Sequence, residues 1–485
     1  MTVLLNIFLS CYAIGVFFYP PLYNIGFYGF FFLILLHFKK EKRLRHLFLK
    51  FNQKYRLWII VSIIILMAFT GCFYTIAPQK EAFIIFLRRF LTLSTALVFI
   101  PFFIQYENFI KKLLLLFTLS GALYCAIAAF HPLHFLRINP IPISMLIGYI
   151  VVVLSIQILL YRKNFYLYAS RFIFFFAFLI CFNSEKTGVV ASIASIASIA
   201  SIASIASIAS IASIASIASI ASIASIASIA SIASIAKRGL FILVVIVTIF
   251  GIGIYSKSNL CCRLNSFFIT LFPKISSTIQ RESSHIQRES SHIQRESSSI
   301  QRESSSIQRE SSSIQRESSS IQRVAMQKQC LHILKTSPFW GNGTASYGSV
   351  IKERSLDWIS WKYTPQATPR WFTTVHPHND FCHWCVQFGY IGGSLYLIFM
   401  GYFIVFFIKK MSVACFPSFL GLGTLIFFGV CSQCDMMLGS SIIQSVFLLG
   451  LSICIAKVVR KEMLSSLQKR LSKIEISKWV KNHGS

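Results

Sequence analysis

The sequence predicts an all-α polytopic membrane protein with about twelve transmembrane helices and one large loop on the outer side. Of the 485 residues, 55% are hydrophobic, and 47 phenylalanines stand against only 16 acidic residues. Water-soluble domains do not tolerate that balance. The apolar residues fall into long runs, and the basic residues cluster between these runs. The net charge of +30 is therefore explained by basic loops on the inner side of a membrane, and no nucleic-acid partner is expected.

The N-terminal part, residues 1–255, is expected to form a bundle of membrane spans. The first two runs make a hairpin that is broken at Pro20-Pro21. The segment Met1–Phe18 lacks a basic n-region and a cleavage site, so it is interpreted as a retained first span. The stretch from Lys39 to Arg56 is strongly basic, which predicts a cytoplasmic loop. Further spans are expected at 57–76, 83–104, 113–130, 143–161, 172–182 and 240–255.

Two low-complexity repeats interrupt this organisation. From Ala191 to Ala236 a Ser-Ile-Ala triplet recurs. Its period drifts against the helical repeat of about 3.6 residues, so isoleucines cover every side. A uniformly apolar helix with small residues suits a bilayer, and we interpret the tract as one span lengthened by repeat expansion. From Ile279 to Ser320 a seven-residue unit with a single isoleucine recurs; it cannot form a coiled-coil seam and indicates a solvated spacer.

The second half of the chain contains the expected outer loop and the last spans. Residues 256–387 contain no plausible span and form the large loop. Residues 388–458 are expected to hold three spans, at 390–408, 413–431 and 441–458. The tail, residues 459–485, is basic with a loose apolar face, which predicts a cytoplasmic helix lying on anionic membrane lipids.

One polar segment at the end of the outer loop is the candidate for chemistry. It runs from Trp371 to Asp380 and contains His376, His378 and Asn379, just before an apolar helix. Imidazole exchanges protons near neutral pH, so either histidine is a candidate general base. In the alternative interpretation these residues only cap a helix and hold a loop at the headgroup level. The residue types alone do not separate the two interpretations.

The spacing of this segment resembles the motif of the O-antigen ligase and polymerase family. The motif consists here of His378-Asn379, an apolar helical turn, then Val386-Gln387-Phe388-Gly389 and Gly392. The family usually has a glutamate at the position that Gln387 occupies in this chain.

A second signature of the family is an arginine that opens a helix ending in a Pro-x-x-Gly-x-Gly turn. Arg323 and, further along, Pro338, Gly341 and Gly343 resemble this signature. The glycines permit a tight turn and a close approach of the backbone to a ligand.

The resemblance implies a GT-C-like enzyme of the bacterial inner membrane, with its large loop in the periplasm. Its implied reaction transfers a polysaccharide from an undecaprenyl-diphosphate-linked donor to a hydroxyl of the lipid A core. His378, or His376 if the register differs, would deprotonate or orient the acceptor hydroxyl. Asn379 would orient the imidazole or cap the following helix. A diphosphate is already a good leaving group, so no cofactor or metal is expected.

Four basic residues are candidates for stabilising the departing diphosphate. Arg323 would bind it through its planar guanidinium. Lys186 stands where the family has an arginine, at the outer end of a span. Arg88 and Arg89 lie one turn inside an expected span, where charges usually face the bundle interior. Snorkelling of these two arginines to the headgroups is the alternative.

Three other functions stay open at this level. An O-antigen polymerase would use another carrier-linked glycan as acceptor, and a protein O-oligosaccharyltransferase would use a Ser or Thr hydroxyl. A transporter would explain the spans without catalysis, but it should show repeat symmetry between its halves. The repeats in this chain are low-complexity tracts of another kind.

Two pairs of cysteines with two-residue spacing lie near the expected outer face. They are Cys382 with Cys385 and Cys431 with Cys434. A zinc site or a disulfide is conceivable for such pairs. The pairs lie far apart in the sequence, which favours the disulfide over the metal.

Overall fold

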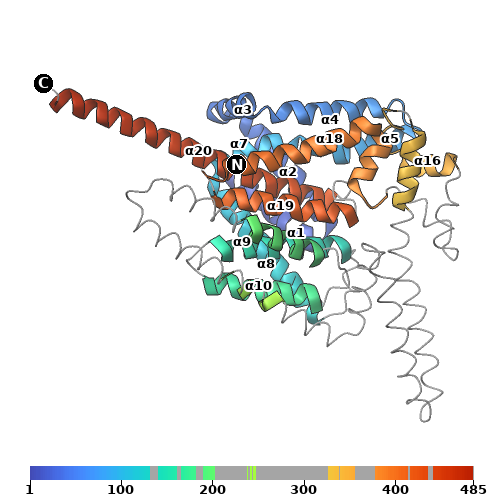
Figure 1. Ribbon diagram of the computed structural model, residues 1–485, viewed down its shortest axis with the longest axis horizontal. Helices are drawn as coiled ribbons and strands as arrows, with labels where there is room; N and C mark the ends of the chain where they lie inside the picture. The colour runs from blue at the N-terminus through green and yellow to red at the C-terminus, as the bar shows by residue number, and fades with distance from the viewer. Residues whose placement is uncertain are drawn as a thin grey trace, which may run out of the picture.

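The computed structural model describes residues 1–130, 140–160, 165–181, 189–202, 326–337, 339–354, 377–412, 415–434 and 441–483, with six residues between 238 and 246. Most of the Ser-Ile-Ala tract, the whole heptad tract, and the candidate residues Lys186, Arg323 and His376 lie outside these ranges. Within them, every regular element is a helix (Figure 1).

Seven of the described helices are long and apolar enough to cross a membrane, or up to eight if one bent pair is counted as a span. Three shorter apolar helices accompany them, among them Val189–Ile202 in the Ser-Ile-Ala tract. The described part of the chain is thus that of an all-helical polytopic membrane protein. The expected total of about twelve spans is not reached within it.

The N-terminal hairpin agrees with the sequence. Helix α1 (Thr2–Phe18) ends at Tyr19, whose extended backbone, with φ of −153°, interrupts the helical hydrogen bonds. Helix α2 (Pro20–Lys40) then begins with proline at its first position. Proline is favoured there because its missing N–H would have no helical partner. The two prolines therefore set the position of the turn.

The basic stretch that was expected to be a loop is instead helix α3 (Lys42–Tyr55). The helix ends at Arg56, which adopts a left-handed conformation with φ of 52°. Helix α4 (Leu57–Gly71) follows after a bend of 85°. Leu44 and Phe51 are buried on one side of α3 while its basic residues are exposed, so α3 is amphipathic. A basic face indicates a side of the membrane, but it is compatible with a helix as well as with a loop.

The next apolar helices follow α4 along the chain. One apolar segment is built from α5 (Gln79–Ile85), a π-helical turn at Phe86–Phe90, the short α6 (Leu91–Leu93) and α7 (Thr95–Gln105). Three longer helices follow: α8 (Glu107–Phe130), α9 (Pro140–Leu160) and α10 (Phe165–Cys181).

The C-terminal part contains a short helix, α16 (Tyr347–Glu353), and three long ones, α18 (Asp380–Lys410), α19 (Cys415–Cys434) and α20 (Ser441–His483). The expected last span and the basic tail form one continuous helix, α20. Helix α16 lies at one end of the bundle, while α3 and the projecting part of α20 lie at the opposite end (Figure 1).

Candidate functional site

The polar segment before α18 is fixed by Asn379. Its side-chain Oδ1 accepts a hydrogen bond from the backbone N–H of Cys382 at 2.9 Å, so Asn379 caps the N-terminus of α18. Its side-chain amide donates to Oε1 of Gln433 at 3.0 Å, at the end of α19. The residue is buried, with 5% of its surface exposed. The capping role considered for Asn379 is therefore present, and it also joins two helices.

His378 directly precedes this cap and is half-buried. Its backbone lies in the left-handed region, with φ of 52°. Residues other than glycine rarely adopt this conformation, and such strain is found preferentially at functional sites. The cap and the left-handed backbone together fix the course of the chain at His378, at the start of α18.

Helix α18 is broken inside the motif that carries the family resemblance. Phe388 and Gly389 have non-helical backbones, and Gly389 has φ of 62° and ψ of −152°. The break leaves backbone groups of α18 without their helical partners. The carbonyl oxygens of Val386 and Gln387 are therefore free to accept hydrogen bonds from another segment.

The turn at residues 339–343 provides those partners. The backbone N–H of Asn342 donates to Val386 O at 3.2 Å, and that of Gly343 donates to Gln387 O at 2.8 Å. In return, Tyr390 donates its N–H to Phe339 O at 3.1 Å. The two sequence motifs are thus hydrogen-bonded to each other.

Glycine is required on both sides of this contact. Gly341 has φ of 82° and Gly343 has φ of 87°. A Cβ atom on Gly341 would lie 2.3 Å from the backbone nitrogen of Gly389, and one on Gly389 would lie 2.0 Å from Phe339 O. The backbones of the turn and of α18 can meet this closely only without side chains.

The same turn also contacts the end of α4. Thr344 donates its N–H to Gly71 O at 3.1 Å and its hydroxyl to Ala68 O at 2.6 Å. The hydroxyl of Thr75 donates to Thr344 O at 2.6 Å. The sequence predicted that this span continues to residue 76. Helix α4 instead ends at Gly71, and the turn binds to its end. The site therefore joins α4, the turn at residues 339–343 and α18.

Arg354 supports the turn from the other side. Its guanidinium donates to Asn342 Oδ1 at 3.1 Å and to the hydroxyl of Thr336 at 2.7 Å. Asn342 in turn donates its amide to Val386 O at 3.0 Å and to the hydroxyl of Ser337 at 2.8 Å. The side chain of Asn342, which was not singled out in the sequence, therefore makes three hydrogen bonds that fix the conformation of the turn.

A polar cluster lies directly beneath the turn, within the helices. Nη1 of Arg89, from the π-helical turn, lies 3.3 Å from Nε2 of His383. The side-chain amide of Gln387 is hydrogen-bonded to the same imidazole nitrogen. An arginine N–H can only donate, so Nε2 of His383 is the acceptor in its contact with Arg89. Asp380 is close enough to Arg89 for an electrostatic interaction.

Gln444 completes the cluster from α20, where its amide donates to Arg89 O at 2.6 Å. The side-chain oxygens of Gln387 and Gln444 are buried and have no hydrogen-bond partner among the described residues. A cavity of about 10 Å³ lies between Arg89, His383 and Gln444, which is about the space of one water molecule. Side-chain oxygens without a hydrogen-bond partner and a cavity of the size of one water molecule therefore belong to the same cluster.

The structure places the predicted residues unequally. Gly341 and Gly343 lie against the break in α18. Asn379 caps the start of α18, and Arg89 contacts His383 of the same helix. Arg88 is exposed on the π-helical turn. His383 has a central position that sequence reasoning did not give it. The signal was its spacing of three residues from Asp380 and four from Gln387, which places all three on one helical face.

Three of the four paired cysteines are recorded within the described ranges. There, Cys382, Cys385 and Cys431 are free thiols. No cluster of three or more His, Cys, Asp or Glu side chains suited to a metal ion is found among these residues.

Comparison of the chain with models of known protein families and with curated proteins finds no match.

Proposed function

We propose that the protein is a membrane glycosyltransferase of the O-antigen ligase type. It would transfer a polysaccharide from undecaprenyl diphosphate to a hydroxyl of the lipid A core. One observation carries the proposal: the Gly341–Gly343 turn is hydrogen-bonded to the break in α18 at Gln387–Gly389. These are the two motifs on which the resemblance rests, and they are more than 40 residues apart in the sequence.

The chemistry of the proposal is a single displacement. The acceptor hydroxyl attacks the anomeric carbon of the donor, a new C–O bond forms, and the bond to the diphosphate oxygen breaks. The electron pair leaves with undecaprenyl diphosphate, and the imidazole of His378 takes the proton of the hydroxyl. His378 suits this role because it is half-buried and directly precedes the cap at Asn379.

Arg89 is the described cation best placed to stabilise the leaving group. His383 and Asp380 hold its guanidinium, while a guanidinium has five N–H donors in all. Preorganised donors of this kind stabilise developing negative charge at low reorganisation cost. Arg323, Lys186 and Arg88 remain proposed contributors, the first two from outside the described ranges. The basic end of the bundle would then face the cytoplasm and the turn the periplasm of the inner membrane.

The test is complementation of a bacterial strain that lacks its O-antigen ligase, read as the lipopolysaccharide profile on a gel. The wild-type chain should restore long glycan on lipid A, and His378→Ala should reduce it by at least tenfold. His332→Ala, an exposed histidine in the loop helix at 326–336, is the matched control and should leave the profile unchanged.

The same experiment separates the alternatives. A polymerase would be indicated by restoration of chain length in a strain whose lipid carries single units. A protein transferase would be indicated by changed glycoproteins with unchanged lipopolysaccharide. If His378→Ala changes neither surface glycan nor glycoproteins, the catalytic assignment is wrong.

A further inference from the structure

A cavity of about 650 Å³ lies at the basic end of the bundle, between α3, α7 and α20. It is on the opposite end from α16 and the turn (Figure 1), so it is separate from the candidate site. Its volume is within the range of sites that hold small molecules, about 300–1,000 Å³. None of the residues assigned to the glycan reaction lines it.

The walls of this cavity combine two kinds of side chain. Leu47 and Phe51 of α3 face Met463 and Leu467 of α20, and these four make an apolar wall. Lys50, Lys54 and Arg460 line the same cavity. No acidic side chain lines it. The lining therefore fits a molecule with an anionic head and an apolar chain.

The cations at the cavity are incompletely neutralised. Lys54 pairs with Glu462 at 2.6 Å, and Arg460 pairs with Glu107 at 2.6 Å. Lys50 is exposed and has no ion-pair partner among the described residues. It is the cation whose charge is most available to a ligand.

Helix α3 lies where lipid headgroups are expected. It meets the apolar helix α4 at 85°, so when α4 crosses the bilayer, α3 runs nearly parallel to the membrane surface. Its residues Lys42–Tyr55 include five Lys or Arg and no acidic side chain. An amphipathic helix of this kind lies in the interface of a membrane, and its basic residues attract anionic lipids.

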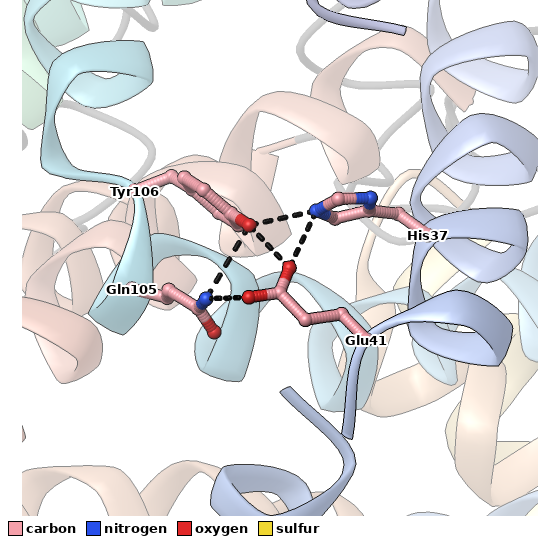
Figure 2. Close-up of polar contacts among 4 residues, drawn as sticks. All are labelled: His37, Glu41, Gln105 and Tyr106. Carbon is pink, nitrogen blue, oxygen red and sulfur yellow. Dashed lines mark hydrogen bonds and ion pairs between the residues drawn. The ribbon is translucent and has the colours of Figure 1, made fainter. Parts of the chain in front are cut away.

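Both ends of α3 are fixed to the bundle. At its start, Glu41 contacts His37, Gln105 and Tyr106, as Figure 2 shows. His37 lies 2.8 Å from Glu41 and 2.7 Å from the hydroxyl of Tyr106. These contacts join the start of α3 to the end of α7.

At its other end, α3 is tied to α20 and α18. The hydroxyl of Tyr55 donates to Glu462 at 2.8 Å, and Lys410 pairs with the same carboxylate at 3.1 Å. The hydroxyl of Tyr402 donates to Tyr55 O at 2.6 Å. The cavity is therefore held open by its own framework, and a ligand would not have to create it.

We propose that this cavity binds one anionic phospholipid of the inner leaflet, with its phosphate at Lys50 and Arg460 and an acyl chain along the apolar wall. The occupant is a lipid and not a soluble anion, because the leucine, phenylalanine and methionine side chains of the wall can contact an acyl chain but make no favourable contact with a free phosphate. Binding would join α3 and α20 across the cavity and stabilise the basic end of the bundle. The proposal does not depend on the glycan-transfer function.

The experiment uses the purified full chain in nanodiscs of phosphatidylcholine, into which phosphatidylglycerol is titrated. Bound lipid is counted by native mass spectrometry, and stability is followed by thermal unfolding. One phosphatidylglycerol should bind preferentially and raise the unfolding temperature. Lys50→Gln should weaken this binding about fivefold, the effect expected for one cation near a membrane surface.

Arg45→Gln is the matched control, because Arg45 is an exposed cation of the same helix that does not line the cavity. It should change phosphatidylglycerol binding less than twofold. Leu467→Trp, which fills the apolar wall without changing charge, should abolish the stoichiometric lipid. Equal losses for Lys50→Gln and Arg45→Gln would mean general surface attraction and would overturn the proposal. Equal stabilisation by inorganic phosphate alone would overturn it as well, because the acyl contact would then be unused.

Discussion

Gly343 donates its backbone N–H to the carbonyl oxygen of Gln387 over 2.8 Å. The bond connects the turn at residues 339–343 to the place where α18 departs from helical geometry. The turn and the helix therefore form a single unit, and a substitution in either should destabilise both.

Gly341→Ala should destabilise this unit strongly. The new methyl group would meet the backbone of Gly389 at 2.3 Å, and the left-handed backbone of residue 341 adds a cost of about 1–2 kcal/mol. We expect a clear fall in the unfolding temperature and loss of glycan transfer. Gly401→Ala is the control, because a Cβ atom there meets nothing within 4 Å; it lies within helical α18 and should be neutral or slightly stabilising. An unchanged unfolding temperature for Gly341→Ala would contradict the docking of the turn.

His383→Ala should cost about 1–3 kcal/mol of stability, because Arg89 and Gln387 lose a buried hydrogen-bond partner. The change is best measured as a double-mutant cycle with Arg89→Gln, in which the coupling should be about 0.5–3 kcal/mol. Arg88→Gln, on the exposed neighbour, should change stability by less than about 0.5 kcal/mol. Additive effects of His383→Ala and Arg89→Gln would show that the two side chains do not interact.

Cys330 and Cys382 should form a disulfide when the purified protein is treated with a diazene oxidant, which takes up the two thiol protons and two electrons. Cys330 of the loop helix at 326–336 is buried, and Cys382 of α18 packs against the same cluster. The thiolate is the reacting form of a cysteine, so the reaction should be faster at pH 9 than at pH 7. Peptide mass spectrometry would identify the link. Cys330→Ser should abolish it and Cys385→Ser should not; a link that persists in Cys330→Ser would place the loop helix elsewhere.

Tyr106→Phe should lower stability by about 1 kcal/mol at neutral pH. The hydroxyl of Tyr106 donates to Glu41 and lowers the pKa of that carboxyl below its usual value of 4.5. A depressed carboxyl pKa stabilises the fold above the unfolded value, and this contribution is lost as the pH falls through the folded value. The difference in unfolding temperature between wild type and variant should therefore be full at pH 7 and shrink below about pH 4. A difference that is independent of pH would exclude the carboxylate as the cause.

Local chemistry in the sequence predicted part of the fold well. Pro20 sets the start of α2, and the long apolar runs locate α8, α9 and α19 within a few residues. Helix α3 was missed because its basic residues were interpreted by the side of the membrane they indicate, which says nothing about backbone conformation. The first two turns of α18 were missed because His383 and Gln387 are polar, and hydropathy recognises a span only after them.

The candidate site was predictable in its motifs and not in its contacts. The Gly341-x-Gly343 turn and the segment at His378 could be identified from spacing. The hydrogen bond between Arg89 and His383 joins residues 294 positions apart, and no local pattern encodes such a pairing. The same holds for Thr344 and Ala68, which are 276 positions apart.

That last separation has a consequence for the order of biogenesis. The end of α4 is synthesised early, while the turn that binds it appears only after most of the chain has been made. The remaining partner, the break in α18, follows later still. The end of the bundle that carries the turn must therefore be completed after the N-terminal helices have inserted, since its parts do not coexist before then. A ribosome that stalls before residue 387 would release a chain with inserted helices and no assembled site.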